Sequence, residues 1–207
     1  MEQDTIFVDS EGDHWYERNK KKLIPEREDK VIQMILESGI NPARIIEVGC
    51  SNGYRLEKLR QMFQAECYGI DASSEAINAG KKNFPNLFLK KCGLAEYCSE
   101  KQFDLVICNF VLHWIDRNNI IQAMTNIARL VTSGGILILG DFLPDYNQKR
   151  RYHHLPEQKI YTYKQDYAQF FVATGIFQEV TRQTYSHGIH GGGMDSVRRK
   201  VRLDFIA

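Results

Sequence analysis

Residues 43–71 read Ala-Arg-Ile-Ile-Glu-Val-Gly-Cys-Ser-Asn-Gly-Tyr-Arg-Leu-Glu-Lys-Leu-Arg-Gln-Met-Phe-Gln-Ala-Glu-Cys-Tyr-Gly-Ile-Asp, and this stretch decides the fold. The β-branched residues among 45–48 are typical of a strand buried on both faces of a parallel sheet. Gly49 and Gly53 permit a sharp turn, and apolar residues three and four apart then predict a one-sided helix. Asp71 ends a second strand about twenty residues on, where an acid can bind ribose hydroxyls. The stretch predicts half of a nucleotide-cofactor fold.

The spacing of the acid and the glycines indicates the kind of cofactor. A dinucleotide fold carries G-x-G-x-x-G because a pyrophosphate sits against the helix N-terminus. Here the pattern is Glu47-x-Gly49-x-x-x-Gly53. A carboxylate so close to the turn would repel a pyrophosphate, but it suits a cofactor that carries an ammonium and a sulfonium group. An ordinary buried strand and turn, or another nucleotide fold, are alternatives on this stretch alone.

The pattern resembles motif I of the class I S-adenosylmethionine-dependent methyltransferases, whose common form is [DE]-x-G-x-G-x-G; Ser51 stands at the middle glycine. The resemblance implies a Rossmann-like α/β fold with a doubly wound, mostly parallel seven-stranded sheet and a C-terminal antiparallel hairpin. It also implies S-adenosyl-L-methionine as cofactor and S-adenosyl-L-homocysteine as product. The cofactor residues that we expect are Glu47, Gly49, Cys50, Ser51, Asn52, Gly53, Asp71, Ala72, Gly93, Leu94, Ala95, Asn109 and Phe110.

Other segments fit the same fold, and the likeness spans about residues 26–142. Buried strands are expected at 87–89, 103–108 and 136–139, and amphipathic helices at 31–36, from Ser73 or Ser74 to about Asn83, and from Ile120 to Val131. Further on, Thr162 is expected to begin a helix that Gly175 stops. Residues 177–185 and 197–205 read as the closing strands, with a glycine-rich hairpin loop at 186–193 between them.

An N-terminal segment, residues 1–25, precedes a single domain at 26–207 and contains a dense group of aromatic and polar residues. We expect this segment to act as a lid, with Tyr16 shielding the cofactor and Arg18 and Asn19 reaching a carboxylate or an anionic substrate. The alternative is that Trp15 and Tyr16 pack an ordinary helix on the domain.

The segment after the fourth strand holds the first candidate for a catalytic base. Asn109 should line the cofactor site, and His113 and Trp114 should face the acceptor, because ligands gather at the carboxyl ends of parallel strands. An imidazole is suited to accept a proton near neutral pH. The Asn-x-x-Leu-His-Trp pattern resembles that of small-molecule methyltransferases and lacks the Pro-Pro of enzymes that methylate the amino groups of bases. A nucleic-acid partner is therefore not expected.

A basic segment, Lys149–His154, follows the fifth strand, where methyltransferases of this class build acceptor specificity. Arg150, Arg151 and Tyr152 are predicted to bind an anionic substrate by charge-assisted hydrogen bonds, and His153 and His154 are second candidates for the base. The alternative is a solvated basic loop. The adjacent histidines lack the spacing of a structural zinc site, so no metal is expected.

The composition limits the partners and the location that we expect. The 207 residues carry a net charge of +1, which gives no general attraction to nucleic acid or membrane. No apolar stretch approaches the about 18 residues of a membrane-spanning helix, and the N-terminus lacks the pattern of a signal peptide. The five cysteines show no C-x-x-C spacing, so neither a zinc ribbon nor a redox dithiol is indicated. We therefore expect a cytoplasmic protein. The resulting hypothesis is O-methylation of a small anionic molecule: a sugar, phosphate or carboxylate. A protein or RNA methyltransferase and a non-catalytic cofactor-binding module are the alternatives; the sequence does not indicate the oligomeric state.

Overall fold

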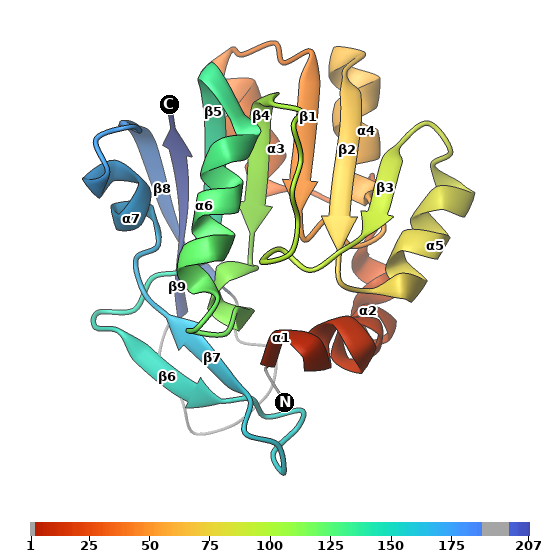
Figure 1. Cartoon of the computed structure of the whole chain (residues 1–207). Coiled ribbons are helices and arrows are strands. Elements are labelled where there is room, and N and C mark those ends of the chain that lie inside the picture. The colour runs from red at the N-terminus through yellow and green to blue at the C-terminus, as the bar shows by residue number, and fades with distance from the viewer. Residues whose placement is uncertain (1–2, 188–198) are drawn as a thin grey trace.

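One seven-stranded sheet organises the computed structural model, which describes residues 3–187 and 199–207 (Figure 1). The strand order is β3-β2-β1-β4-β5-β9-β8. The strands are β1 Arg44–Val48, β2 Glu66–Asp71, β3 Phe88–Lys91, β4 Phe103–Asn109, β5 Val131–Phe142, β8 Glu179–His187 and β9 Arg199–Ile206. β1 to β5 are parallel, whereas β9 pairs antiparallel with β5 and β8 antiparallel with β9. The predicted doubly wound sheet with its closing hairpin is confirmed; residues 188–193 of the hairpin loop expected at 186–193 lie outside the described residues.

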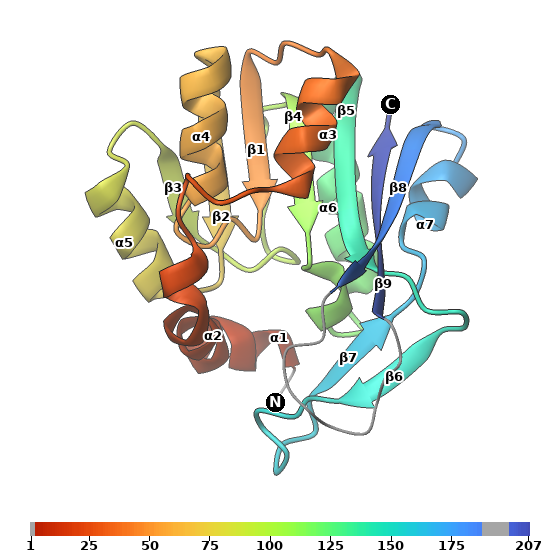
Figure 2. The same cartoon turned by 180° about the vertical axis from the view of Figure 1, so that it is seen from behind.

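Helices cover both faces of the sheet. Figures 1 and 2 show α6 (Ile120–Leu130) on one face and α3 (Lys30–Ser38) and α4 (Tyr54–Phe63) on the other, with α5 (Ser74–Asn83) beside β3. Adjacent residues of each central strand enter opposite cores: Ile46 packs in the core that includes α6, and Ile45 in the core that includes α3 and α4. This two-sided burial explains why the strands read as continuous apolar runs.

Short-range signals set the helix boundaries as predicted. Ser73 caps α5, since its hydroxyl accepts a hydrogen bond from the Ala76 amide at 3.0 Å. Gly39 ends α3 with a φ of 69°, in the left-handed region that glycine adopts without strain.

The predicted helix from Thr162 is wrong at its start, and the basic segment is only partly a loop. Tyr161–Lys164 forms strand β7, which pairs antiparallel with β6 (Gln148–Arg151), and the helix α7 is confined to Ala168–Ala173. The Tyr-Thr-Tyr sequence favours a strand because aromatic and β-branched side chains pack well across a hairpin. The Lys149 ammonium lies 4.0 Å from the Tyr161 ring centroid, which adds a cation–π contact to the pairing.

The N-terminal segment is one helical run: α1 (Gln3–Ile6), a π-helical turn (Phe7–Glu11), α2 (Gly12–Asn19) and a 3₁₀ turn (Lys20–Lys22). It lies beneath the carboxyl ends of the parallel strands in both views (Figures 1 and 2). Asp13 fixes it to α5, because its carboxylate accepts hydrogen bonds from Ser73 Oγ at 2.6 Å and the Glu75 amide at 3.0 Å. Gly12 lets this close approach occur: a Cβ there would lie 3.1 Å from the Ser73 nitrogen.

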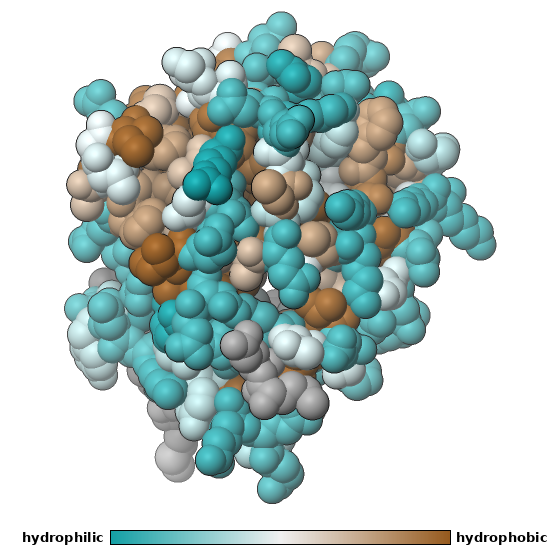
Figure 3. All heavy atoms as spheres, viewed as in Figure 1, coloured by the Kyte–Doolittle hydropathy of each residue, from teal (hydrophilic) through white to brown (hydrophobic). Residues whose placement is uncertain are grey.

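The face of the molecule that Figure 3 draws is mostly hydrophilic. Figure 3 shows apolar residues as separate spots among polar side chains on the face that it draws. Within the described residues, no helix has both the length and the apolar character that crossing a membrane requires.

The docking of the N-terminal helix gives a first prediction. Gly12→Ala should destabilise the fold by about 1–3 kcal/mol, because the added methyl group would meet the Phe7 carbonyl oxygen at 2.8 Å and must displace backbone. Urea unfolding measures the loss, and faster tryptic cleavage at Lys20–Lys22 would show that the helix has loosened. Asp9→Ala, an exposed change in the same helical run, is the control; equal stability of the two variants would contradict the close approach.

Candidate functional site

A cavity of about 1440 Å³ opens at the carboxyl ends of β1, β2 and β4, between the N-terminal helical segment and the β6–β7 hairpin. The predicted residues that line it are Asn19, Glu47, Gly49, Cys50, Ser51, Asp71, Ala72, Gly93, Leu94, Ala95, Asn109, Phe110, His113, Trp114, Arg150, Arg151, Tyr152 and His153. The predicted residues outside its lining are Tyr16, Arg18, Asn52, Gly53 and His154. One cavity thus brings together the cofactor residues and the acceptor candidates.

The turn between β1 and α4 forms the base of the cavity. Gly49 has a φ of 72°, and a Cβ on it would lie 2.3 Å from Val111 Cγ2, so the position requires glycine. Ser51 also has a positive φ, 53°, in the left-handed region. This conformation explains why the family motif has a glycine there, and serine adopts it at a cost of about 1–2 kcal/mol. Asn52 supports the turn from behind, donating a hydrogen bond to the Leu23 carbonyl at 3.1 Å.

Asp71 joins this turn to the end of β2. Its carboxylate accepts one hydrogen bond from the Ser51 amide at 2.7 Å and another from the Ser73 amide at 2.8 Å. Burial raises the pKa of the carboxyl group, and the two amide hydrogen bonds oppose that rise. A carboxylate has about four lone-pair sites, so Asp71 retains acceptor capacity on the cavity side.

Glu47 lies in a buried charged group behind the turn. The Arg55 guanidinium bonds to Glu47, and its Nε donates to Asp29 Oδ2 at 2.8 Å. The second Asp29 oxygen caps α3 through the Val31 amide. Burial raises the pKa of Glu47 to about 7, although Arg55 acts in the opposite direction. Glu47 Oε2 has no hydrogen-bond partner, so this oxygen is available to a ligand.

The 93–95 turn is fixed from α6. Asn126 Nδ2 donates to the carbonyl oxygens of Leu94 and Ala95, at 3.0 Å each. The Leu94 side chain is buried in the core that includes α6, and the turn also lines the cavity. The segment can thus offer apolar surface and backbone groups to a flat ring.

The end of β4 supplies a polar atom without a partner. Asn109 Oδ1 is buried and makes no hydrogen bond. Phe110 follows with a φ of 59°, and its amide donates to the Gly140 carbonyl at 2.8 Å. This left-handed residue turns the chain sharply from the strand into the segment that carries His113.

His113 lies on a 3₁₀ turn, Leu112–Trp114, and is only 3 % exposed. Its backbone amide donates to Asp141 Oδ2 at 3.1 Å, and its Nδ1 lies 2.9 Å from Asp141 Oδ1. The Nδ1–Oδ1 distance is short, but Oδ1 lies away from the direction of the ring N–H, so these two atoms do not form a hydrogen bond. Sequence reasoning missed Asp141, although an acid at the end of the fifth strand, one residue after the Gly140 that pairs with Asn109, was a signal for it.

Aromatic side chains form a wall of the cavity around His113, at the end where the acceptor is expected (the acceptor end). The Trp114 ring contacts the rings of Phe7, Tyr152 and His113, with centroids 4.9, 4.6 and 4.6 Å away. The Phe142 ring also contacts His113, with its centroid 5.0 Å away. This wall brings together residues of the N-terminal helix, the 3₁₀ turn and the β6–β7 arm.

The two adjacent histidines differ in placement. Both are exposed, and their ring centroids lie 3.9 Å apart with the planes tilted by 41°, but only His153 lines the cavity. Partial burial, with the charges of His153 and Arg18, lowers the pKa of His154.

The N-terminal aromatic and basic residues lie differently from the expectation. Tyr16 is buried in a small core with Leu23, Tyr54 and Ala76. Arg18 bonds to the buried Glu11 carboxylate and, at 2.9 Å, to the Tyr152 hydroxyl. Shielding of the cofactor by Tyr16 and contact of Arg18 with a carboxylate or an anionic substrate stay predictions, and neither residue lines the cavity.

Two polar residues that sequence reasoning missed connect the segment to the acceptor end. Gln3 Nε2 donates to the carbonyls of Trp114 at 2.5 Å and Tyr161 at 2.8 Å, and Glu11 accepts from the Tyr152 hydroxyl at 2.5 Å. Nothing local in the sequence indicates these contacts, which join residues more than 100 positions apart.

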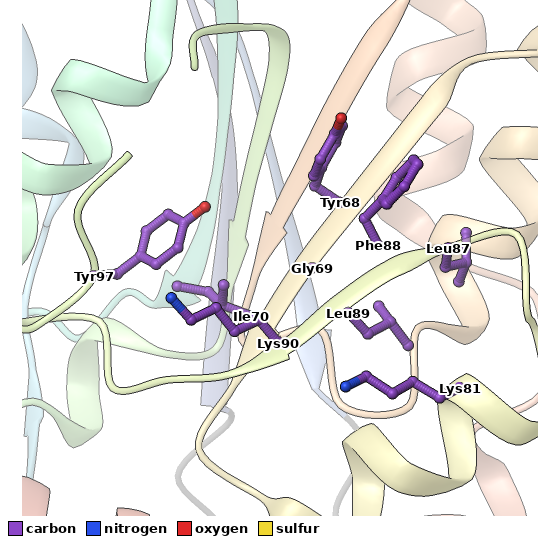
Figure 4. A pocket seen from close by; sticks show the side chains of 9 residues that line it. All are labelled: Tyr68, Gly69, Ile70, Lys81, Leu87, Phe88, Leu89, Lys90 and Tyr97. Atoms are coloured by element: carbon purple, nitrogen blue, oxygen red, sulfur yellow. The ribbon is translucent and has the colours of Figure 1, made fainter. Parts of the chain in front are cut away.

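A second depression, of about 380 Å³, surrounds the edge strand β3, with Tyr97, Lys90 and Phe88 among its lining residues (Figure 4). It shares only Ile70 with the large cavity. None of the predicted cofactor residues lines it, so the large cavity is the candidate site.

Comparison with known sequences identifies the family. A family model described as a methyltransferase domain matches residues 16–185. Trans-aconitate 2-methyltransferase of Methylobacterium nodulans is 25 % identical over 167 residues, which cover 72 % of this chain and 64 % of the relative. Malonyl-[acyl-carrier protein] O-methyltransferase of Bacillus cereus is 28 % identical over 102 residues, 48 % of this chain and 37 % of the relative. The chain thus spans less than two thirds of these curated relatives.

Solved structures share the fold. The N-methyltransferase NodS of Bradyrhizobium japonicum, in complex with S-adenosyl-L-homocysteine, superposes with a TM-score of 0.63 at 17 % identity, covering 92 % of this chain and 96 % of that one. The 1,6-didemethyltoxoflavin-N1-methyltransferase of Burkholderia thailandensis gives 0.69 at 13 % identity, covering 98 % and 85 %. With the family match over residues 16–185 and the glycine turn at the end of β1, the chain belongs to the methyltransferase-domain family and has the class I methyltransferase fold.

Proposed function

We propose that the large cavity binds S-adenosyl-L-methionine and a small anionic acceptor, and that the protein methylates an oxygen of that acceptor. One observation carries the proposal. Glu47 Oε2, Ser51 Oγ and Asn109 Oδ1 are buried polar atoms without partners in the described structure, and all three residues line the cavity. Buried polar atoms are nearly always satisfied, so such a group marks the place of a polar ligand.

The residues present fit the proposed cofactor, which supplies an electrophilic methyl group when bound. Asp71 has the acceptor capacity for two ribose hydroxyls, and Glu47 and Asn109 offer oxygens to an ammonium group. The required glycine at position 49 keeps the turn free of side-chain atoms. We propose that residues 1–25 act as a lid on the domain formed by 26–207, excluding water through the Gln3 and Glu11 contacts.

The acceptor end favours a small anion. Arg150, Arg151 and Lys164 line the cavity beside the aromatic wall, and cations of this kind bind carboxylates and phosphates strongly. The relatives named for trans-aconitate and malonyl-[acyl-carrier protein] support an acidic substrate. The N-terminal helix and the β6–β7 hairpin border the cavity, which favours a small acceptor over a folded macromolecule.

Cofactor binding through Asp71 gives the second prediction. Asp71→Ala should weaken S-adenosyl-L-homocysteine binding at least roughly tenfold in calorimetry, since two hydrogen bonds to a charged acceptor are lost. Glu66→Ala, which removes an exposed carboxylate at the other end of β2, is the matched control. Equal affinity in wild type and Asp71→Ala would sink the ribose assignment.

Acceptor binding gives the third prediction. A screen of small acids, sugar phosphates and nucleotide sugars, read by mass for one added methylene, would identify an acceptor. With it, the Arg150→Ala/Arg151→Ala variant should raise the acceptor KM roughly tenfold or more and leave S-adenosyl-L-homocysteine binding unchanged, because only contacts to the acceptor are removed. Lys159→Ala, an exposed cation of the same arm, should behave as wild type. An unaltered KM in the double variant would exclude the two arginines from acceptor binding.

A further inference from the structure

The contact between His113 and Asp141 sits in an enclosed place in the wall of the cavity. The Asp141 carboxylate is 5 % exposed and lies 2.9 Å from Nδ1 of His113. It also accepts hydrogen bonds from the Phe142 amide at 2.7 Å and the His113 amide at 3.1 Å. The carboxylate is therefore held against the ring, and a turn of the imidazole about its Cβ–Cγ bond would align Nδ1–H with it.

The turn that carries His113 is fixed from three sides. The His113 amide bonds to Asp141, the Trp114 carbonyl accepts from Gln3, and the Leu112 carbonyl accepts from Arg117 at 3.1 Å. Arg117 is itself held by the Tyr167 hydroxyl at 3.0 Å. Such support is what a catalytic side chain requires, because its position must be set before the substrate arrives.

The two ring nitrogens of His113 differ in surroundings. Nδ1 is fully enclosed and faces Asp141. Nε2 makes no hydrogen bond in the described structure and is not among the enclosed atoms, while the residue lines the cavity. A carboxylate that accepts a hydrogen bond from Nδ1–H would favour the Nδ1–H tautomer and leave the Nε2 lone pair for an acceptor in the cavity.

A cation lies one ring away from this base. The Lys164 ammonium is 4.2 Å from the Phe142 ring centroid, and that ring is 5.0 Å from the His113 ring. An acceptor held by its anionic group at Lys164 could thus place a neighbouring group against Nε2. The anion would then anchor the substrate and need not be the group that reacts.

We propose that Asp141 is the positioning residue for His113 and that the methyl acceptor is a hydroxyl group of an anionic substrate, distinct from the anion itself. The inference rests on the proposed function. The acceptor oxygen forms its bond to the methyl carbon, the carbon–sulfur bond breaks with its electron pair staying on sulfur, and the hydroxyl proton passes to Nε2. A carboxylate or phosphate oxygen would already be deprotonated and would make no use of this base.

The tautomer of His113 tests the role of Asp141 without any acceptor. Nitrogen-15 NMR of histidine-labelled protein at about pH 8, where an ordinary imidazole is neutral, distinguishes Nδ1–H from Nε2–H. The chain has six histidines, and the His113 signal is assigned by its loss in His113→Gln. The wild type should show Nδ1–H, and Asp141→Ala should shift the proton toward Nε2. Asp204→Ala, which removes another buried carboxylate from β9, should leave the tautomer unchanged.

The outcomes separate the two proposals. An Nε2–H wild type that still binds S-adenosyl-L-homocysteine would overturn the role of Asp141 alone, and this reading holds even if Asp141→Ala fails to fold. Absence of S-adenosyl-L-homocysteine binding in calorimetry would instead count against the proposed function.

The product of the reaction tests the acceptor group. Hydroxy acids and the matching acids without a hydroxyl group are compared in the mass screen, and each product is treated with mild alkali. A methyl ether, stable to alkali and formed only from hydroxy acids, is expected; an alkali-labile methyl ester would overturn the proposal. With the identified acceptor, Asp141→Ala should lower kcat roughly 10²-fold or more at unchanged KM. A change confined to KM would assign Asp141 to substrate binding.

Discussion

The Asp71 carboxylate is the contact on which the cofactor end of the molecule depends. It binds the Ser51 amide of the glycine turn and the Ser73 amide that precedes α5. Ser73 in turn caps α5 and donates its hydroxyl hydrogen bond to Asp13 of the N-terminal helix. Asp71 therefore links the turn to the start of α5, and Ser73 extends this link to the N-terminal helical segment.

The acceptor end is assembled from parts of the chain that are distant in sequence. Gln3 contacts Trp114 and Tyr161, and Glu11 contacts Tyr152, so the N-terminal helix joins the segment after β4 to the β6–β7 arm. The sheet alone provides neither the aromatic wall nor the cations of the lining, Arg150, Arg151 and Lys164. The N-terminal helical segment is therefore held over the cavity by a few polar contacts between distant residues, whereas the cofactor end is held by the Asp71 contacts at the carboxyl ends of β1 and β2.

The sequence predicted the sheet and the cofactor end well because their signals are local. Apolar runs mark the central strands, Ser73 and Gly39 mark helix ends, and the glycines mark the turn. The β7 strand was mistaken for a helix because Tyr161–Lys164 is a strand only through its pairing with β6. Asp141, Gln3 and Glu11 act through partners 28 to 158 residues away, and no local pattern encodes such contacts.

The cavity contains both cations and a candidate base, His113, and these two features suit different chemical groups of a substrate. An enzyme that methylates a carboxylate needs cations to orient it and has no use for a general base, so a buried His113–Asp141 pair would bring only the cost of enclosing polar groups. The structure has both Lys164, a cation of the cavity lining, and the His113–Asp141 pair, and the Phe142 ring contacts Lys164 and His113. Their coexistence is explained most simply when the two act on different groups of one substrate. Specificity would then come from the distance between the anion and the hydroxyl group, a property that the Phe142 ring sets directly.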